Sequence, residues 1–145
     1  MAKTYSAPKQ AEKYLQLFRF VEDQVGLPKN LLLRLAQQES YFNPLATNPS
    51  GAQGMMQIVP KWHPGVDPFK PEEAIPYAGK FLLDNFNRFG TWRAALAAYN
   101  WGPGNVKAAL NKHSGDIDSV LMDVKLVPLE TRNYVAQITA DVPVV

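Results

Sequence analysis

The sequence has no cysteine, only two histidines and no long apolar run. Without cysteine the chain cannot form a disulfide or offer a thiolate to a metal. A histidine-based metal site is also disfavoured, because His63 and His113 are the whole supply. No apolar stretch is long enough to cross a bilayer as a helix. The first ten residues, MAKTYSAPKQ, lack the apolar core of a signal peptide.

A strong charge of either sign is missing as well. The formal net charge is +2 and the basic residues are not clustered, which gives no support for nucleic-acid binding. The mild positive excess suits a polyanionic surface such as a bacterial cell wall. The chain has 145 residues, of which 46% are hydrophobic and 19% charged, enough for one compact domain with a core. We therefore treat residues 1–145 as a single globular domain.

Helical periodicity dominates, and the sequence shows no internal repeat and no alternating strand pattern. A first helix is expected to begin near Ser6–Pro8 and to stop at Gly26, and a second to begin at Pro28 and end at Pro44. Further helices are expected over residues 77–89, 92–101, 106–110, 116–122 and 128–141, with Thr91 as a cap and a frayed tail after Asp141. In the last of these, Thr131, Val135 and Ile138 are expected on one face and Tyr134 at its edge. Residues 43–54 and 61–76 are expected to be irregular, with a turn at Asn48–Gly51, and 55–59 is either a helical turn or a short strand. The predicted fold class is mainly α, with about seven helices.

The second helix carries an acid among aliphatic residues. At about 100° per residue, Leu32, Leu35, Ala36 and Glu39 share one sector, and Arg34 is expected to point away from it. Desolvation on such a stripe raises a carboxyl pKa, so a protonated Glu39 is a candidate general acid. The alternative is an ordinary helix-end glutamate that bonds a loop amide.

The segment after Glu39 offers polar groups. The Ser40 hydroxyl could orient the carboxylate or simply cap the helix end. In Gly51–Gln57 the glycines permit close approach of a ligand, and exposed backbone groups suit the amides and hydroxyls of a sugar. The alternative for this stretch is a plain surface loop, with Met55 and Met56 in the core.

Three later features have weaker patterns. Tyr99 lies in an apolar stripe and its hydroxyl needs a partner when buried, for which Glu39 is a candidate. Glu130 and Tyr134 are four apart and are expected side by side, with a helix-start glutamate and a half-buried tyrosine as the alternative. Trp62 and His63, between prolines, could mark a binding surface, although a structural use is favoured. No second catalytic carboxylate is marked.

Four motifs nevertheless follow one another in a familiar order. The strings ESYFNPLA from Glu39 and GAQGMMQIVP from Gly51 resemble the first two motifs of the soluble-type lytic transglycosylase domain. AAYNWGPGNV from Ala97 resembles its third, and ETRNYV from Glu130 its C-terminal motif. The order and the spacing also agree over about residues 39–135.

This resemblance implies a lysozyme-like fold of the goose-type lysozyme superfamily. It also implies cleavage of the β-1,4 bond between N-acetylmuramic acid and N-acetylglucosamine in peptidoglycan. Glu39 matches the family's sole catalytic acid/base. The positions expected to line the sugar site or hold the acid are Ser40, Gly54, Gln57, Tyr99, Asn100, Glu130 and Tyr134. No metal and no cofactor is implied.

The sequence departs from the family's pattern at three places. Met55 replaces the usual leucine, a tolerable apolar exchange. Trp101 replaces a small residue and could either extend a sugar-stacking surface or narrow a subsite. Residues 61–67, KWHPGVD, are not the family's usual continuation, which leaves the neighbouring subsite undetermined.

With one marked carboxylate, the expected reaction is a transglycosylation in which Glu39 acts as acid and then as base, and 1,6-anhydro ends form. Ordinary glycosidases use two carboxylates, so a hydrolytic lysozyme with Glu130 or a loop aspartate as second acid is the first alternative. A non-catalytic wall-binding module is the second. The expected partner is the peptidoglycan glycan strand. The protein is expected to act as a monomer, to bind no nucleic acid and not to insert into a membrane. The N-terminus favours a bacteriophage lysis or virion protein, or an excised domain, acting on the cell wall.

Overall fold

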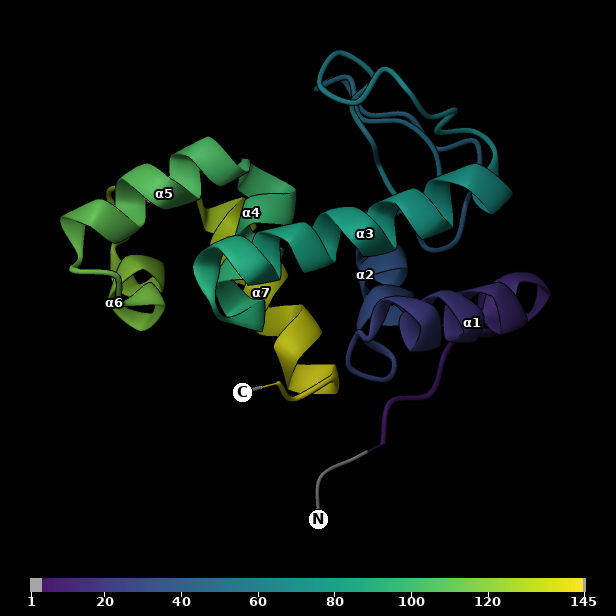
Figure 1. The fold of residues 1–145 in the computed structure, drawn as a ribbon, viewed down its shortest axis with the longest axis horizontal. Coiled ribbons are helices and arrows are strands. Elements are labelled where there is room, and N and C mark those ends of the chain that lie inside the picture. Colours follow the sequence, from purple (N-terminus) through teal and green to yellow (C-terminus); the bar gives the residue numbers. More distant parts are fainter. Residues whose placement is uncertain (1–3, 145) are drawn as a thin grey trace. The chain divides into compact units, whose positions relative to one another are not determined.

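The structure is a computed structural model that describes residues 4–144. Its helices, in chain order, are η1 (Lys9–Tyr14, a 3-10 helix), α1 (Leu15–Val25), α2 (Leu31–Ser40), α3 (Pro71–Phe89), α4 (Trp92–Trp101), α5 (Pro103–Lys112), α6 (Ile117–Met122) and α7 (Leu129–Asp141) (Figure 1). Within residues 4–144 there is no β-strand, only isolated bridges from Gln53 to Thr47 and to Ile58. None of these helices has the length and apolarity that a membrane span requires. The prediction of a mainly α fold is confirmed.

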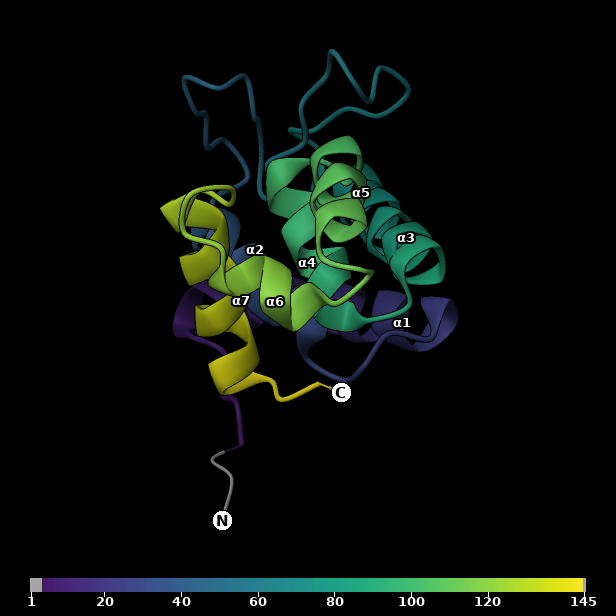
Figure 2. The same cartoon turned by 90° about the vertical axis from the view of Figure 1, so that its left-hand side faces the viewer.

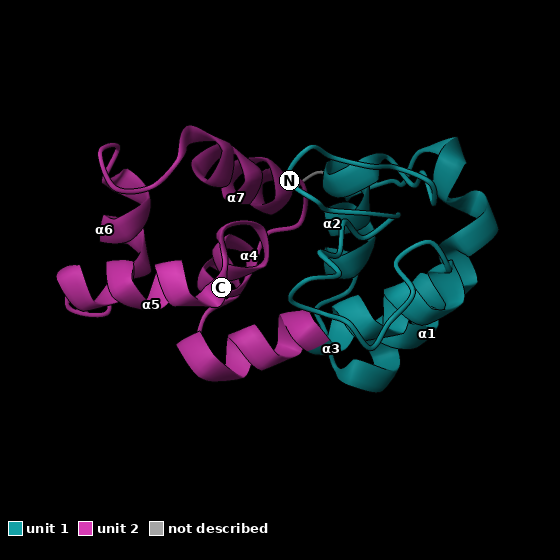
Figure 3. Cartoon of the chain, turned by 90° about the horizontal axis from the view of Figure 1, so that it is seen from above, with its two compact units in different colours: residues 1–80 teal, residues 81–145 magenta. Residues whose placement is uncertain are grey.

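The chain divides into two compact units, one ending at Lys80 and the other beginning at Phe81 (Figure 3). The boundary falls inside α3, so the first turns of this helix belong to unit 1 and its remainder to unit 2. Each unit is described by itself below.

Unit 1 is built around α2. All six residues of Leu31–Ala36 are buried, so this helix is covered on every side over its first turns. Helix α1 packs on it and ends at Gly26, whose φ of 86° is the left-handed conformation that glycine adopts readily. Gly79 of α3 sits in the same core, because a Cβ there would lie 2.7 Å from Val21 Cγ1. A larger residue at position 79 would push these helices apart.

A long segment without helix, residues 41–70, connects α2 to α3 in unit 1 (Figure 1). Its predicted turn is confirmed: the Gly51 N–H donates to the Asn48 carbonyl and the Ser50 N–H donates to the Asn48 side chain. Residues 55–59 are neither helix nor strand but a tight turn. It is closed by two backbone hydrogen bonds between Gln53 and Ile58, of 2.9 and 3.0 Å.

Unit 2 is built around α4, which packs against α5 and α7 (Figure 2). Residues 94–98, four alanines and Leu96, are all buried, and their small size lets the neighbouring helices approach closely. The cap predicted at the start of α4 is confirmed, since Thr91 Oγ1 accepts from the Ala94 N–H at 3.1 Å. Helix α6 begins with Asp116 as its cap, and α7 follows Pro128, both where the sequence predicts.

Several predicted boundaries are wrong, mostly because proline was given too much weight. Helix α3 begins at Pro71 and contains Pro76, so the irregular segment ends earlier than predicted. Pro103 opens α5, which is longer than the predicted 106–110, because proline is well suited to the first helical position. Helix α2 begins at Leu31 and ends at Ser40, before Tyr41 and Phe42, both of which have positive φ.

Both ends of the chain also differ from the prediction. Ser6 caps no helix, because the chain enters the 3-10 helix η1 at Lys9, after Pro8. The tail after Asp141 is not wholly frayed: Val142 is buried and its N–H donates to the Ile138 carbonyl.

Candidate active site

Glu39 lies at the point where α2 leaves the core of unit 1. Leu32, Leu35 and Ala36 are buried as predicted, whereas Glu39 itself is half-buried. Arg34, which was predicted to point away from this sector, is buried as well, and its Nη1 donates to Gln38 Oε1 at 3.1 Å. Glu39 therefore follows a helix segment that is buried on all sides, whereas the sequence pattern indicated a helix with one buried face. A carboxylate there is held by rigid structure and is still partly open.

A more deeply buried acid in unit 1, Glu22, was missed by the sequence analysis. It lies on α1, four residues after Phe18 and therefore on the buried face, which is the signal that could have revealed it. Its Oε1 accepts from the Asn30 N–H at 2.9 Å and its Oε2 from the Leu33 N–H at 3.1 Å. Burial raises the pKa of Glu22, and the backbone N–H groups oppose this rise. Glu22 thus caps α2 from outside that helix and fixes the helix that carries Glu39.

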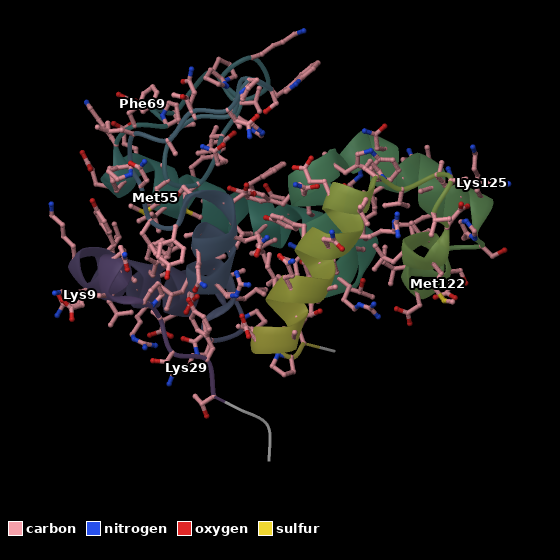
Figure 4. All side chains as sticks on the ribbon, turned by 180° about the vertical axis from the view of Figure 1, so that it is seen from behind. Lys9, Lys29, Met55, Phe69, Met122 and Lys125 are labelled. Carbon is pink, nitrogen blue, oxygen red and sulfur yellow. The ribbon has the colours of Figure 1, made fainter. Side chains whose placement is uncertain are left out.

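Ser40 ties the end of α2 to the following loop. Its hydroxyl donates to the Met55 carbonyl at 2.7 Å and accepts from the Asn43 N–H at 3.2 Å. Because a hydroxyl has a single hydrogen, that hydrogen is not available to the carboxylate of Glu39. The capping alternative holds for Ser40. Met55 and Met56 are fully buried, as the core interpretation predicted. Met55 lies at the base of the loop (Figure 4).

Gly54 allows another group to come close to its backbone, but that group is the Pro68 carbonyl of the same chain and not a ligand. It has φ of 77°, and a Cβ there would lie 1.7 Å from the Pro68 carbonyl oxygen. Its N–H donates to the Ala46 carbonyl at 2.7 Å. The space that was expected to admit a ligand is therefore filled by backbone. Gly54 holds segments 43–54 and 61–70 together.

Gln57 is half-buried in the same loop and has φ of 52°. Its Nε2 donates to the Gly54 carbonyl at 2.9 Å and to the Ala46 carbonyl at 3.4 Å. The amide hydrogens of Gln57 are therefore used within the loop. Its carbonyl oxygen is the side-chain atom that can meet a sugar.

Unit 2 brings Asn100 together with the start of α7. Thr131 Oγ1 donates to Asn100 Oδ1 at 2.8 Å, and Asn100 Nδ2 donates to Glu130 Oε1 at 3.4 Å. Asn100 is half-buried and Glu130 is exposed, so both have polar atoms within reach of a ligand. Thr131 was assigned only to the apolar face, and sequence spacing could not reveal its bond to a residue 31 positions away.

The aromatic residues of unit 2 have different exposures. Tyr99 is half-buried, and its ring lies 5.6 Å from that of Phe81, centroid to centroid. Tyr134 is 3% exposed, so its expected place at the edge of α7 is wrong, and it does not share the exposure of Glu130. Trp101 is half-buried and its carbonyl accepts from Asn105 Nδ2 at 2.7 Å. The predicted pairing of Tyr99 with Glu39 stays a prediction.

The two histidines serve in pairs within their own units. His63 Nδ1 lies 2.6 Å from the Tyr77 hydroxyl oxygen, and burial lowers the pKa of His63. His113 Nε2 lies 2.9 Å from Asp123 Oδ2. Across residues 4–144, no three histidine or acidic side chains gather in a way that could hold a metal ion.

The helical architecture and the half-buried acid at the end of α2 define a lysozyme-like domain. The model of the transglycosylase SLT domain matches residues 16–121, and the chain belongs to this family. The resemblance predicted from four motifs is thereby confirmed.

Relatives of known name agree with this assignment. The chain is 34% identical over 142 residues to the soluble lytic murein transglycosylase of Escherichia coli (strain K12), covering 88% of this chain and 22% of that protein. It is 32% identical over 165 residues to the membrane-bound lytic murein transglycosylase C of Photorhabdus laumondii subsp. laumondii, covering 90% of this chain and 46% of that protein. The chain thus spans less than half the length of either relative.

Solved structures give the same fold. The 70 kDa soluble lytic transglycosylase of Escherichia coli superposes with a TM-score of 0.74 at 32% identity, over 88% of this chain and 23% of that one. A complex of the 70 kDa soluble lytic transglycosylase with bulgecin A gives a TM-score of 0.77 at 29% identity, over 92% of this chain and 24% of that one. The lysozyme-like fold class is confirmed.

Proposed function

We propose that this domain is a peptidoglycan lytic transglycosylase in which Glu39 is the only catalytic carboxylate. The observation that carries the proposal is the position of Glu39, half-buried at the end of a buried helix, in a chain of the SLT family. A general acid needs this combination of restricted hydration and access to substrate. The buried acid of unit 1, Glu22, is engaged in capping α2 and is not a candidate for the second carboxylate.

The reaction follows from a single carboxyl group used twice. Protonated Glu39 donates its proton to the glycosidic oxygen as the bond to C1 of N-acetylmuramic acid breaks. The 2-acetamido group of the same sugar stabilises the positive charge at C1. Ionised Glu39 then takes the proton from the C6 hydroxyl, and O6 bonds to C1. A 1,6-anhydro ring forms, the acid regains its proton and no water is consumed.

The remaining site residues differ in whether they contact the substrate directly or position other residues. Gln57, Asn100 and Glu130 contact the sugar directly, because each has polar atoms at a partly open position. Tyr99 binds substrate or holds the acid. Ser40, Gly54 and Tyr134 act on substrate only through the residues that they position, since their hydrogen bonds or burial commit them to the protein. The protein works at the bacterial cell wall as a monomer, and its expected bacteriophage origin stays a prediction.

Digestion of purified peptidoglycan followed by mass analysis of the products tests the proposal. Anhydro ends are one water lighter than reducing ends, so a lytic transglycosylase and a hydrolytic lysozyme give different masses. We expect anhydro ends from the wild-type chain and at least a thousandfold slower cleavage by Glu39→Gln, which cannot donate or take the proton. Glu130→Gln is the matched control, and it should weaken binding while leaving the product mass unchanged.

Other outcomes identify the alternatives. Reducing ends alone indicate a muramidase and contradict the single-carboxylate reaction. Binding to peptidoglycan without any cleavage indicates a wall-binding module. Equal activity of Glu39→Gln and wild type removes Glu39 from the chemistry, provided that circular dichroism shows both proteins folded.

A further inference from the structure

Trp62 in unit 1 is an exposed aromatic residue whose backbone is fixed by neighbouring residues. Trp62 is 70% exposed, in the segment 61–67 that departs from the family's usual sequence. Single exposed apolar residues are common on protein surfaces, so the exposure of Trp62 is informative only together with the arrangement of its backbone and of the neighbouring Lys61. A use in the protein's own core is excluded by this exposure.

The backbone beneath Trp62 is fixed by hydrogen bonds. The Trp62 N–H donates to the Val59 carbonyl at 3.0 Å, and the His63 N–H lies within 3.1 Å of the same carbonyl. The His63 ring is anchored to Tyr77 of α3 by the 2.6 Å contact and by edge-to-face packing with centroids 5.3 Å apart. An indole presented on a rigid turn loses little conformational freedom when it binds a ligand.

Lys61 defines how the indole can be used. Its Nζ lies 5.0 Å from the centroid of the Trp62 ring, so the ammonium group occupies one face of the indole. The exposed part of the indole is a flat apolar surface, and the Lys61 ammonium group is a cation beside it. The apolar face of a pyranose ring can stack on the indole, and a carboxylate attached to that sugar can pair with the ammonium group. Peptidoglycan offers both, since its glycan carries peptide stems with free carboxylates.

We propose that Lys61 and Trp62, here called the Trp62 platform, form an accessory binding site for stem-bearing glycan strands. Trp62 stacks on an N-acetylated sugar ring and Lys61 pairs with a carboxylate of the peptide stem. The platform follows Gln57 by only a few residues, in the same segment, residues 41–70, that begins after α2 and its Glu39. This inference rests on the proposed function and adds to it a specificity for glycan that keeps its stems.

Binding and cleavage are measured separately to test the platform. In the Glu39→Gln background, the affinity for soluble glycan strands with stems is compared with that for strands whose stems an amidase has removed. Trp62→Ala should raise the Kd about five- to tenfold on both ligands, and Trp62→Phe should restore most of the affinity. Lys61→Gln should raise the Kd about two- to threefold on stem-bearing strands only, and the effect should fade in high salt.

Matched controls come from the same unit. Phe20 is 61% exposed on α1, so Phe20→Ala removes a comparable aromatic without touching the platform. Lys29 is exposed and lies far from Phe69, which belongs to the same loop of residues 41–70 as the platform (Figure 4). Lys29→Gln therefore removes an equal charge away from the platform. Neither control should alter the Kd for either ligand.

Three results would overturn the inference. The first is an unchanged Kd in Trp62→Ala, and the second is a loss of the same size in Phe20→Ala. The third is binding to vesicles of phosphatidylglycerol that depends on Trp62 while glycan binding does not, which would make the segment a membrane contact. If the wild-type chain neither cleaves nor binds peptidoglycan, the proposed function fails as a whole. If it cleaves normally and Trp62→Ala binds like wild type, only the platform fails.

Discussion

Gly54 is the residue at which the site loop tolerates least change. Its positive φ disfavours any side chain, and the Pro68 carbonyl occupies the position of a Cβ. Segments 43–54 and 61–70, which flank the Met55–Gln57 turn, meet at this point. The shape of the loop next to Glu39 therefore depends on one hydrogen atom in place of a methyl group.

Replacement of Gly54 by alanine should destabilise the protein by about 3 kcal/mol or more, because steric overlap adds to backbone strain. Urea unfolding followed by circular dichroism measures this change. Gly65→Ala is the control, since position 65 has no atom within 4 Å of a Cβ and should change stability by less than about 1 kcal/mol. A Gly54→Ala protein as stable as Gly65→Ala would mean that the loop can move away from Pro68 freely.

At the scale of elements, α2 is positioned by a neighbouring helix rather than by its own first residues. Asn30, at its N-terminus, is in the left-handed conformation and makes no side-chain cap. Glu22 of α1 supplies the acceptors instead, through both carboxylate oxygens. Helices α4 and α7 are also linked by a side chain of one helix, but here Asn100 bonds the side chains of Thr131 and Glu130 rather than backbone groups.

Loss of the Glu22 carboxylate should therefore disturb the position of Glu39, because both depend on α2. Glu22→Ala leaves the buried N–H groups of Asn30 and Leu33 without an acceptor, and should cost about 2–4 kcal/mol and lower lytic activity. Glu22→Gln keeps one acceptor and should cost less. Chemical unfolding and turbidity loss of cell-wall suspensions measure the two effects. Full activity in Glu22→Ala would show that α2 holds its position without this cap.

The pH dependence of Glu22 has a definite sign. Burial raises its folded-state pKa, so its contribution to stability is complete below the ordinary glutamate pKa and is lost as the pH rises through the raised value. The stability of wild type relative to Glu22→Gln should thus decline on going from acid toward neutral pH. A difference that grows with pH would contradict the burial argument.

At the scale of the whole molecule, acid should destabilise the chain through unit 2. Hydrogen bonds from Ser119 to Asp116, and between His113 and Asp123, hold the pKa of each aspartate below its usual value. A depressed pKa stabilises the fold above the ordinary aspartate range and loses that effect as the pH falls through the folded-state value. Stability should therefore drop below about pH 4.

Thermal unfolding across this pH range measures the effect. Asp123→Asn should be less stable than wild type at neutral pH, and the two should converge in acid as the wild-type carboxylate is protonated. Lys107→Gln, an exposed change on α5, is the control and should follow the wild-type curve. A constant offset between Asp123→Asn and wild type at all pH values would exclude titration of Asp123 as the cause.

Local sequence determined the helical class, the family and the identity of the acid. Helical periodicity, the Thr91 cap and the Asn48–Gly51 turn depend on residues close in the chain, and all are confirmed. The four motifs were sufficient for the family because their order is specific. Proline misled the boundaries of α3 and α5, since its effect depends on its position within a helix.

Tertiary structure alone decided how the site residues are used. Glu22 and Thr131 owe their roles to residues that lie far away in sequence or on other helices, and periodicity carries no information about such partners. The same reason explains Gly54, where a ligand was expected and Pro68 is found. Sequence spacing can place a side chain on a face, but what covers that face is fixed only when the distant segments have packed.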